Sequence, residues 1–244
     1  MALAQNGLVL LLALALGVLL RWWAAGEGRP GDEARRLSPL EAALIATAVI
    51  LNAAVTVAGW WLWQHDWLVL RPGADLWAVL DLVGFILIMD MAMYLGHAAA
   101  HHPRLYPLVH QLHHRWVDPR PSTLFVLHPL EVVGFGSTWL VVLCLYPLHA
   151  WALVGYAVIN LVMGTLGHLG VEPWPPRLRR LEVFRWFPLS SFHGAHHANP
   201  AVNLGFYTTT WDRIFGTLDP TYDRERMGLT NRADRGASEV ADPR

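Results

Sequence analysis

Long apolar runs separated by short polar stretches dominate the chain as far as Pro173. Three of these runs, residues 7–20, 42–63 and 76–96, predict helices that cross a membrane, because one crossing needs roughly 20 mostly apolar residues. The first run has the length of a signal peptide. However, no basic segment precedes it and no Ala-x-Ala-like cleavage pattern ends it, so we expect a membrane helix there.

Two shorter apolar runs, 132–145 and 151–167, flank a turn at Tyr146 and Pro147. At 1.5 Å per residue the first run covers roughly 21 Å, against about 30 Å of hydrocarbon in a bilayer. The pair predicts a helical hairpin that returns to its starting face, and its length leaves open whether it crosses the bilayer completely. The pattern as a whole predicts an all-α membrane bundle of about four or five helices or hairpins.

The polar stretches divide the chain into three parts. Residues 1–75 predict N-terminal membrane helices, and residues 76–222 predict a helical domain whose polar segments form a cap over the bundle. Residues 223–244 lack apolar periodicity, so they are expected to form a flexible tail.

Composition supports a membrane protein. Hydrophobic residues make up 54% of the chain and charged residues 15%, whereas soluble domains are about a quarter charged. The net charge of −1 indicates no nucleic-acid partner. The single cysteine, Cys144, excludes a disulfide framework and a cysteine-rich zinc site.

The arginines predict an orientation. All 18 basic residues are Arg, and the three long spans place residues 26–39, 97–129 and 170–244 on one side of the membrane. That side carries nearly all of the arginines, whereas Arg71 lies on the other side. Because basic loops stay in the cytoplasm, we expect the polar cap on the cytoplasmic face, in a bacterial inner membrane.

Histidine is the unusual residue of this chain, with 13 copies, most of them in short clusters. The clusters read Y-L-G-H-A-A-A-H (His97, His101), H-Q-L-H-H (His110, His113, His114), V-L-H-P-L-E (His128), L-G-H-L-G (His168) and H-G-A-H-H (His193, His196, His197). On a helix, the three rings of H-x-x-H-H lie within an arc of about 100° and can share one metal ion or bridge two. Neutral imidazole is the commonest protein ligand for transition metals.

Carboxylates near these clusters predict supporting roles. Asp90 and Tyr94 lie on the same helix face as His97, so Asp90 is expected to accept the outer N–H of a ligand imidazole. Glu131 follows His128 by three residues and is expected to join it as a ligand or to bond to it. Whether His128 is itself a ligand stays open. Three further histidines, His65, His102 and His149, are expected to be surface residues.

Ligand type alone does not identify the metal, because imidazole suits zinc, copper, iron and nickel. Eight to ten histidines suit two metals and exceed what one closed structural zinc site needs. A metal transporter is the main non-enzymatic alternative, but its ligands are expected near the bilayer midplane. The histidine clusters instead lie at the membrane boundary in arginine-containing sequence, which favours an enzyme.

Residues 90–217 resemble the fatty acid hydroxylase/sterol desaturase superfamily. The resemblance rests on the order and flanks of the stretches D-M-A-M-Y-L-G-H-A-A-A-H, H-Q-L-H-H-R-W-V-D-P-R-P-S-T, H-P-L-E, G-H-L-G, F-H-G-A-H-H and N-L-G-F-Y-T-T-T-W-D-R-I-F-G-T. It implies an all-helical membrane enzyme with a cytoplasmic cap that holds two non-haem irons. Such enzymes use O2 to convert a C–H bond of a membrane lipid into an alcohol or an alkene.

The resemblance also implies roles for individual residues. The metal ligands would be His97, His101, His110, His113, His114, His193, His196 and His197, joined by His168 and by His128 from the H-P-L-E stretch. Asn203 would support the metal site or the substrate channel, together with Asp90, Tyr94 and Glu131. Zinc can replace iron during expression.

No flavin or haem motif is present, so the resemblance implies a separate electron donor of ferredoxin or cytochrome type, with its reductase. The lipid, the choice between hydroxylation and desaturation, and the oligomeric state are left undetermined. A related enzyme that cleaves a lipid ether or aldehyde is an alternative.

Overall fold

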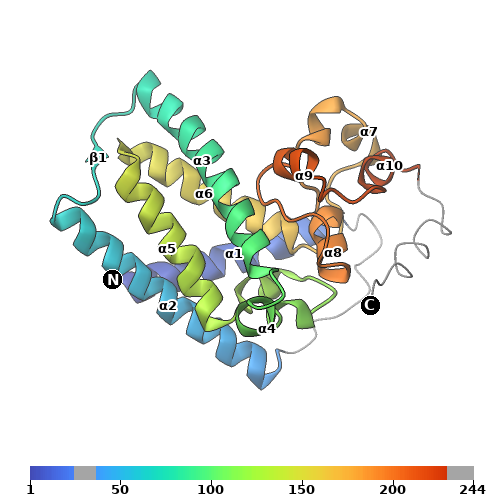
Figure 1. Ribbon diagram of the computed structural model, residues 1–244, viewed down its shortest axis with the longest axis horizontal. Helices are drawn as coiled ribbons and strands as arrows, with labels where there is room; N and C mark the ends of the chain where they lie inside the picture. Colours follow the sequence, from blue (N-terminus) through green and yellow to red (C-terminus); the bar gives the residue numbers. More distant parts are fainter. Residues whose placement is uncertain (25–36, 230–244) are drawn as a thin grey trace.

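The computed structural model describes residues 1–24 and 37–229 of the chain. Five long helices form its body: α1 (Ala2–Ala24), α2 (Pro39–Gln64), α3 (Leu76–Ala100), α5 (Pro129–Leu145) and α6 (Ala150–Gly167) (Figure 1). All but α5 are long and apolar enough to cross a membrane. The predicted all-α membrane bundle is therefore confirmed. Helix α5 has 17 residues, a length of about 26 Å.

The long helices pack around an interior that they share. Helix α2 packs against α1 and α5, while α3 packs against α5 and α6, and α1 also contacts α6. Phe85, Met89 and Tyr156 are fully buried at the centre of this packing. Many Leu, Val and Trp side chains on the outer faces are exposed, as expected for helices that are surrounded by lipid.

Capping residues set the positions at which two of the long helices begin. Ser38 and Glu41 form a capping box that starts α2, and Asp75 accepts a hydrogen bond from the main-chain N–H of Ala78 at the start of α3. At its other end, α3 continues past Gly96 through His97 to Ala100. The first histidine cluster therefore belongs to a membrane helix.

A short parallel pair of strands, β1 (Leu70–Arg71) and β2 (Leu148–His149), was not predicted. Behind it, the Asp81 carboxylate accepts hydrogen bonds from the ring and the main-chain N–H of His149, at 2.7 and 2.8 Å. Asp81 also pairs with Arg71 at 2.6 Å. The expectation that His149 is a surface residue was wrong, because this carboxylate gives it a buried partner.

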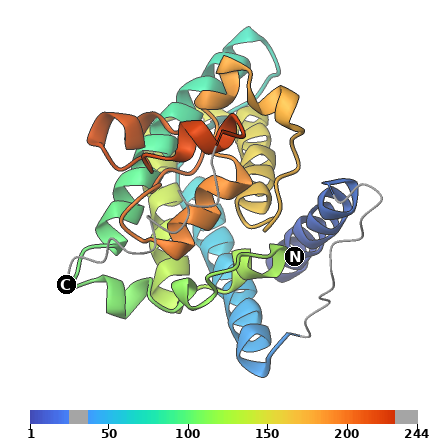
Figure 2. The same cartoon turned by 90° about the vertical axis from the view of Figure 1, so that its right-hand side faces the viewer.

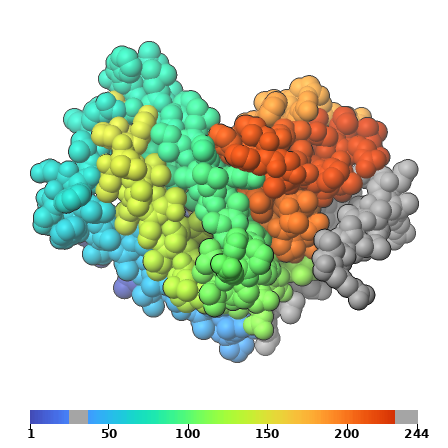
Figure 3. Space-filling model, in the orientation of Figure 1, coloured from blue at the N-terminus to red at the C-terminus, as the bar shows by residue number. Residues whose placement is uncertain are grey.

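Shorter elements form a cap at one end of the bundle. They are α4 (Tyr106–Val109), η1 (His113–Arg115), η2 (Pro121–Phe125), α7 (Pro176–Arg179), η3 (Glu182–Arg185), α8 (Ser190–Ala198), α9 (Thr210–Phe215) and α10 (Tyr222–Arg226). In the side view, the orange and red segments of the cap lie in front of α3 and α6 (Figure 2). The space-filling view shows a notch between the upper part of α3 and this cap (Figure 3).

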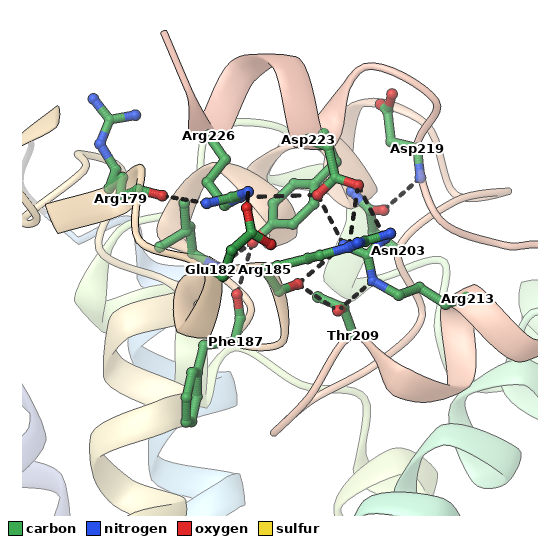
Figure 4. A network of polar contacts seen from close by, with 12 residues as sticks. Arg179, Glu182, Arg185, Phe187, Asn203, Thr209, Arg213, Asp219, Asp223 and Arg226 are labelled. Atoms are coloured by element: carbon green, nitrogen blue, oxygen red, sulfur yellow. Dashed lines mark hydrogen bonds and ion pairs between the residues drawn. The ribbon is translucent and has the colours of Figure 1, made fainter. Parts of the chain in front are cut away.

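The cap includes residues that the sequence assigned to a flexible tail. Asp223 pairs with Arg213 at 2.8 Å, and the buried Arg226 donates hydrogen bonds to the carbonyls of Arg179 and Leu181 (Figure 4). The tail therefore does not begin at Asp223, because charged side chains attach α10 to the rest of the cap. The remainder of that predicted tail, residues 230–244, and most of the predicted polar loop, residues 25–36, lie outside the described residues.

Candidate metal centre

Nine of the ten predicted ligand histidines come together in two groups inside the described part of the chain. The first group consists of His97, His101, His110, His114 and His196, and the second of His113, His168, His193 and His197. Within each group, one ring nitrogen of every residue lies within 4.8 Å of the others. All of these histidines except His101 are buried.

The two H-x-x-H-H stretches each contribute to both groups. In α8, His193 and His197 point to the second group and His196 to the first. The other stretch is not a continuous α-helix, because His110 ends α4 and His113 begins the 3-10 turn η1. Its rings still divide between the groups, with His113 in the second and His110 and His114 in the first.

Main-chain carbonyls fix the orientation of four rings. The Nδ1 atoms of His97, His113, His168 and His196 lie 2.7–3.1 Å from the carbonyl oxygens of Leu204, Val126, Gly164 and Val202, respectively. A carbonyl oxygen can only accept a hydrogen bond, so Nδ1 carries the proton in each of these rings. In a neutral imidazole, Nε2 is then left with its lone pair.

Glu131 orients a fifth ring. Its Oε1 lies 2.7 Å from Nδ1 of His110, and both side chains are buried. A carboxylate behind an imidazole fixes the ring and raises its basicity as a metal ligand. The sequence predicted that Glu131 would act with His128, but the turn at the start of α5 directs it to His110 instead.

The Nε2 atoms of these oriented rings face each other. His97 and His110 approach to 2.9 Å in the first group, and His113 and His168 to 3.3 Å in the second. Two lone pairs at such distances repel each other unless a cation lies between them. The donor set therefore fits one metal ion in each group.

Burial keeps the rings neutral, which is the form that binds a metal. It lowers the pKa of His113 to about 4 and, with the nearby His113, lowers the pKa of His168 to about 3. The pKa of His114 is also lowered to about 3 by burial. Neither ring nitrogen of His114 has a hydrogen-bond partner among the described residues, as expected for a group whose partner is an ion.

His128 lies outside both groups. It is the N-cap of α5, where its Nδ1 accepts a hydrogen bond of 3.2 Å from the main-chain N–H of Leu130. Its inclusion among the ligands was therefore wrong. The H-P-L-E pattern marks a helix start, and the ring is used there as a cap.

Asp90 and Tyr94 support the centre less directly than predicted. Asp90 accepts hydrogen bonds from the main chain of Tyr207 and Thr208 and from the Thr208 hydroxyl, rather than from an imidazole. Tyr94 bonds to the Thr217 hydroxyl at 3.0 Å and stacks on Phe215. The predicted contact of Asp90 with an imidazole was wrong, because this face of α3 packs against residues 203–217.

Asn203 holds the loop that presents two of the carbonyls. It has a φ of 58°, a conformation that Asn tolerates better than most residues. Its side chain donates to the Phe192 carbonyl at 3.0 Å and accepts from the Asp219 main chain at 2.8 Å. The flanking carbonyls, those of Val202 and Leu204, are the ones that bond His196 and His97.

Asp212 is a supporting residue that sequence reasoning missed. Its carboxylate accepts hydrogen bonds from the main-chain N–H groups of Leu204 and Gly205, at 2.7 and 2.9 Å. A Cβ atom on Gly205 would lie 2.6 Å from this carboxylate, so only glycine fits there. The signal was present in the W-D-R of the last matching stretch, but spacing alone did not assign it a role.

An apolar cavity of about 740 Å³ leads to the histidines. Its lining includes His97, His110, His113, His168 and His193, together with side chains from α1, α2, α5 and α6. Phe135, Trp139 and Phe206 are among the aromatic residues of the lining. The volume is within the range of roughly 300–1,000 Å³ that is typical of small-molecule sites.

The chain is similar in sequence to enzymes that are named for their action on sterols. The chain is 29% identical to Delta(7)-sterol 5(6)-desaturase of Leptosphaeria maculans over 60% of this chain and 40% of the relative. It is 31% identical to methylsterol monooxygenase 1 of Gallus gallus, over 58% and 47%, and 29% identical to lathosterol oxidase of Rattus norvegicus, over 60% and 48%. The alignments thus span less than half the length of these relatives. No solved structure matches the chain.

The family model for fatty acid hydroxylase matches residues 82–217, a range that lies within the predicted helical domain 76–222. The match covers all nine histidines of the two groups, together with Glu131 and Asp212. The chain therefore belongs to the fatty acid hydroxylase family.

Proposed function

We propose that this protein uses O2 to oxidise a C–H bond of a membrane lipid at two non-haem irons, one in each histidine group. The facing lone pairs of the Nε2 atoms in both groups, on the wall of an apolar cavity, carry the proposal. The membership of an oxidoreductase family supports it. The nine histidines would hold the irons, since each offers one neutral ring nitrogen.

When bound, the irons would supply the dioxygen activation that no protein side chain can perform. The residues of the chain have other tasks. Glu131 and the four carbonyls keep each Nδ1 protonated and each Nε2 aimed inward. The cavity excludes water and holds the lipid with one segment against His97, His110 and His168.

The names of the relatives include both desaturases and monooxygenases that act on sterols. They favour a sterol-like lipid as substrate, while either outcome, an alkene or an alcohol, suits the same centre. The arginine distribution supports a cytoplasmic active site in a bacterial inner membrane. A separate ferredoxin or cytochrome would then deliver electrons from the cytoplasm.

Purification without oxygen, followed by metal analysis, tests the proposal. We expect about two irons per chain and consumption of O2 when a chemical reductant is added. Mass spectrometry of lipids from cells with and without the protein would identify the product. Failure to take up iron, combined with unchanged lipids in cells that lack the protein, would contradict it.

A further inference from the structure

Two asparagines interrupt the apolar lining of the cavity. Asn52 lies in the middle of α2 and Asn160 near the middle of α6, and both helices are long and apolar enough to cross a membrane. An amide inside a membrane span is costly unless it has a hydrogen-bond partner. Because both side chains line the cavity, a molecule bound in the cavity can be their hydrogen-bond partner.

The Asn160 amide is oriented by two buried tyrosines. The Tyr207 hydroxyl donates a hydrogen bond of 2.5 Å to Oδ1 of Asn160, and the Tyr156 hydroxyl lies 2.6 Å from that of Tyr207. Because Tyr207 gives its proton to Asn160, Tyr156 must be the donor to Tyr207. The amide nitrogen of Asn160 has no acceptor within the described residues, so its two N–H groups are available to a ligand.

Asn52 of α2 supplies a second amide to the cavity wall, close in sequence to Thr56, which binds Asn6 of α1. Asn6 donates hydrogen bonds to the Thr56 hydroxyl and to the Ala2 carbonyl, so its own N–H groups are occupied. Asn52 lines the same cavity, and its main-chain carbonyl accepts from Thr56. Its side-chain amide has no partner in the described part of the chain.

The charges of the lining restrict the chemistry of the ligand. In the described residues, the lining contains no Arg, and its ionisable groups other than Tyr207 are Glu131 and the histidines. A carboxylate or phosphate buried beside the asparagines would therefore have no counter-charge, which is strongly unfavourable. An uncharged oxygen would accept the amide N–H bonds without this cost.

Helix geometry sets the distance between the asparagine and the metal centre. Asn160 precedes His168 by eight residues of α6, which corresponds to about 12 Å at 1.5 Å per residue. We propose that Asn160 binds a hydroxyl or carbonyl oxygen of a neutral lipid at a point about 12 Å along α6 from His168, and that Asn52 offers a second amide to such an oxygen on the α2 wall of the same cavity. This inference rests on the proposed function for the identity of the reacting end.

Equilibrium binding to the purified full-length protein in detergent tests it. The probes are tritiated cholesterol and 1-octadecanol, each competed with the hydrocarbon that lacks the hydroxyl, cholestane or octadecane, and with stearate. We expect at least one alcohol to bind more tightly than its hydrocarbon and than stearate. Asn160→Leu and Asn52→Leu should each lower the affinity for that alcohol by about three- to tenfold. Neither substitution should change the affinity for the matching hydrocarbon.

Asn52→Leu protects the test against misfolding, because it removes no side-chain hydrogen bond of the described protein. Leu161→Val is the matched control, since Leu161 lines the same cavity without a polar atom, and it should leave the alcohol-to-hydrocarbon ratio unchanged. The inference is overturned if neither alcohol outcompetes its hydrocarbon, if stearate binds as tightly, or if both Asn variants keep the wild-type ratio.

Iron content and O2 consumption of the same preparations separate the two proposals. A protein that prefers the alcohols but takes up no iron would contradict the proposed function and leave the oxygen-binding site in place. A protein that holds iron and consumes O2 but does not distinguish alcohol from hydrocarbon would contradict the inference alone.

Discussion

At the scale of single residues, four histidines of the two groups are oriented by main-chain carbonyls and a fifth, His110, by Glu131. The spacing of the imidazoles is visible because histidine is a rare, chemically distinct residue. The carbonyls of Val126 and Leu204, by contrast, leave no mark in a sequence, since every residue has a carbonyl. Asp90 was misassigned because helix periodicity gives the face of a side chain but not what packs against it.

His128 and His113 make a matched pair of histidines with different roles. His128→Ala should keep the full iron content and lower the free energy of unfolding by about 1 kcal/mol, because it removes only a helix cap. His113→Ala should lose the iron of the second group together with activity. Metal analysis and thermal unfolding of both variants check this, and loss of iron from the His128 variant would contradict it.

The histidines also predict how the stability of the metal-free protein depends on pH. Burial lowers the pKa values of His113 to about 4 and of His114 to about 3 in the folded protein, below the usual 6.5 of the unfolded chain. The unfolded state therefore binds more protons in acid. Stability should be complete above about pH 6.5 and fall progressively toward pH 4, by about 1.4 kcal/mol per buried histidine per pH unit.

Melting temperatures of the metal-free protein at pH 7.5, 6.5 and 5.5 measure this effect. The same series on metal-loaded protein is the control, where the fall should begin at lower pH because bound metal competes with protons. A melting temperature that does not change between pH 7.5 and 5.5 would contradict the burial of neutral rings.

At the scale of elements, the positions of the long helices could be predicted because apolar runs persist over 14–22 residues. Their ends could not, since the Ser38 capping box starts α2 three residues before the apolar run and α3 continues through His97 to Ala100. The 3-10 turn at His113 was also missed, because three residues carry too little periodicity to distinguish it from an α-helix. The loop around Gly205 depends on tertiary contacts with Asp212.

Two glycines test the importance of this loop. Gly205→Ala would bring Cβ to 2.6 Å from both Asp212 Oδ2 and the Thr208 carbonyl. We expect this substitution to lower the free energy of unfolding by about 1–3 kcal/mol and to reduce the iron content. Gly194→Ala in α8 is the control, because no atom lies within 4 Å of its new Cβ. It should gain up to about 1 kcal/mol from helix propensity. Equal iron retention in the two variants would argue against the loop's role.

At the scale of the whole molecule, the N-terminal helices belong to the site, although the family match begins at residue 82. Helices α1 and α2 supply part of the cavity wall. The buried Glu41 of α2 pairs with Arg120, just before η2. The sequence divided residues 1–75 from the catalytic part because α1 and α2 share no motif with it, and packing between helices is not visible in a single sequence.

Gly17 tests whether this packing matters for function. A Cβ atom at Gly17 would lie 2.5 Å from the ring carbons of Pro121, so Gly17→Ala should force α1 away from η2. We expect the free energy of unfolding to fall by about 1–3 kcal/mol, which lowers the melting temperature, and lipid binding to weaken. Gly7→Ala in the same helix meets no atom within 4 Å and should retain wild-type binding. Identical behaviour of the two variants would contradict the contact.

The division of each H-x-x-H-H stretch between the two groups has a consequence for the order of assembly. An ion bound in the first group would immobilise His110 and His196, and thereby the segments that also carry His113 and His193 of the second group. The residues of the second site would then lose less conformational entropy when they bind an ion, so the affinity of the second site for iron would be higher. Iron loading should be cooperative, and native mass spectrometry at limiting iron should detect empty and doubly loaded chains with few singly loaded ones.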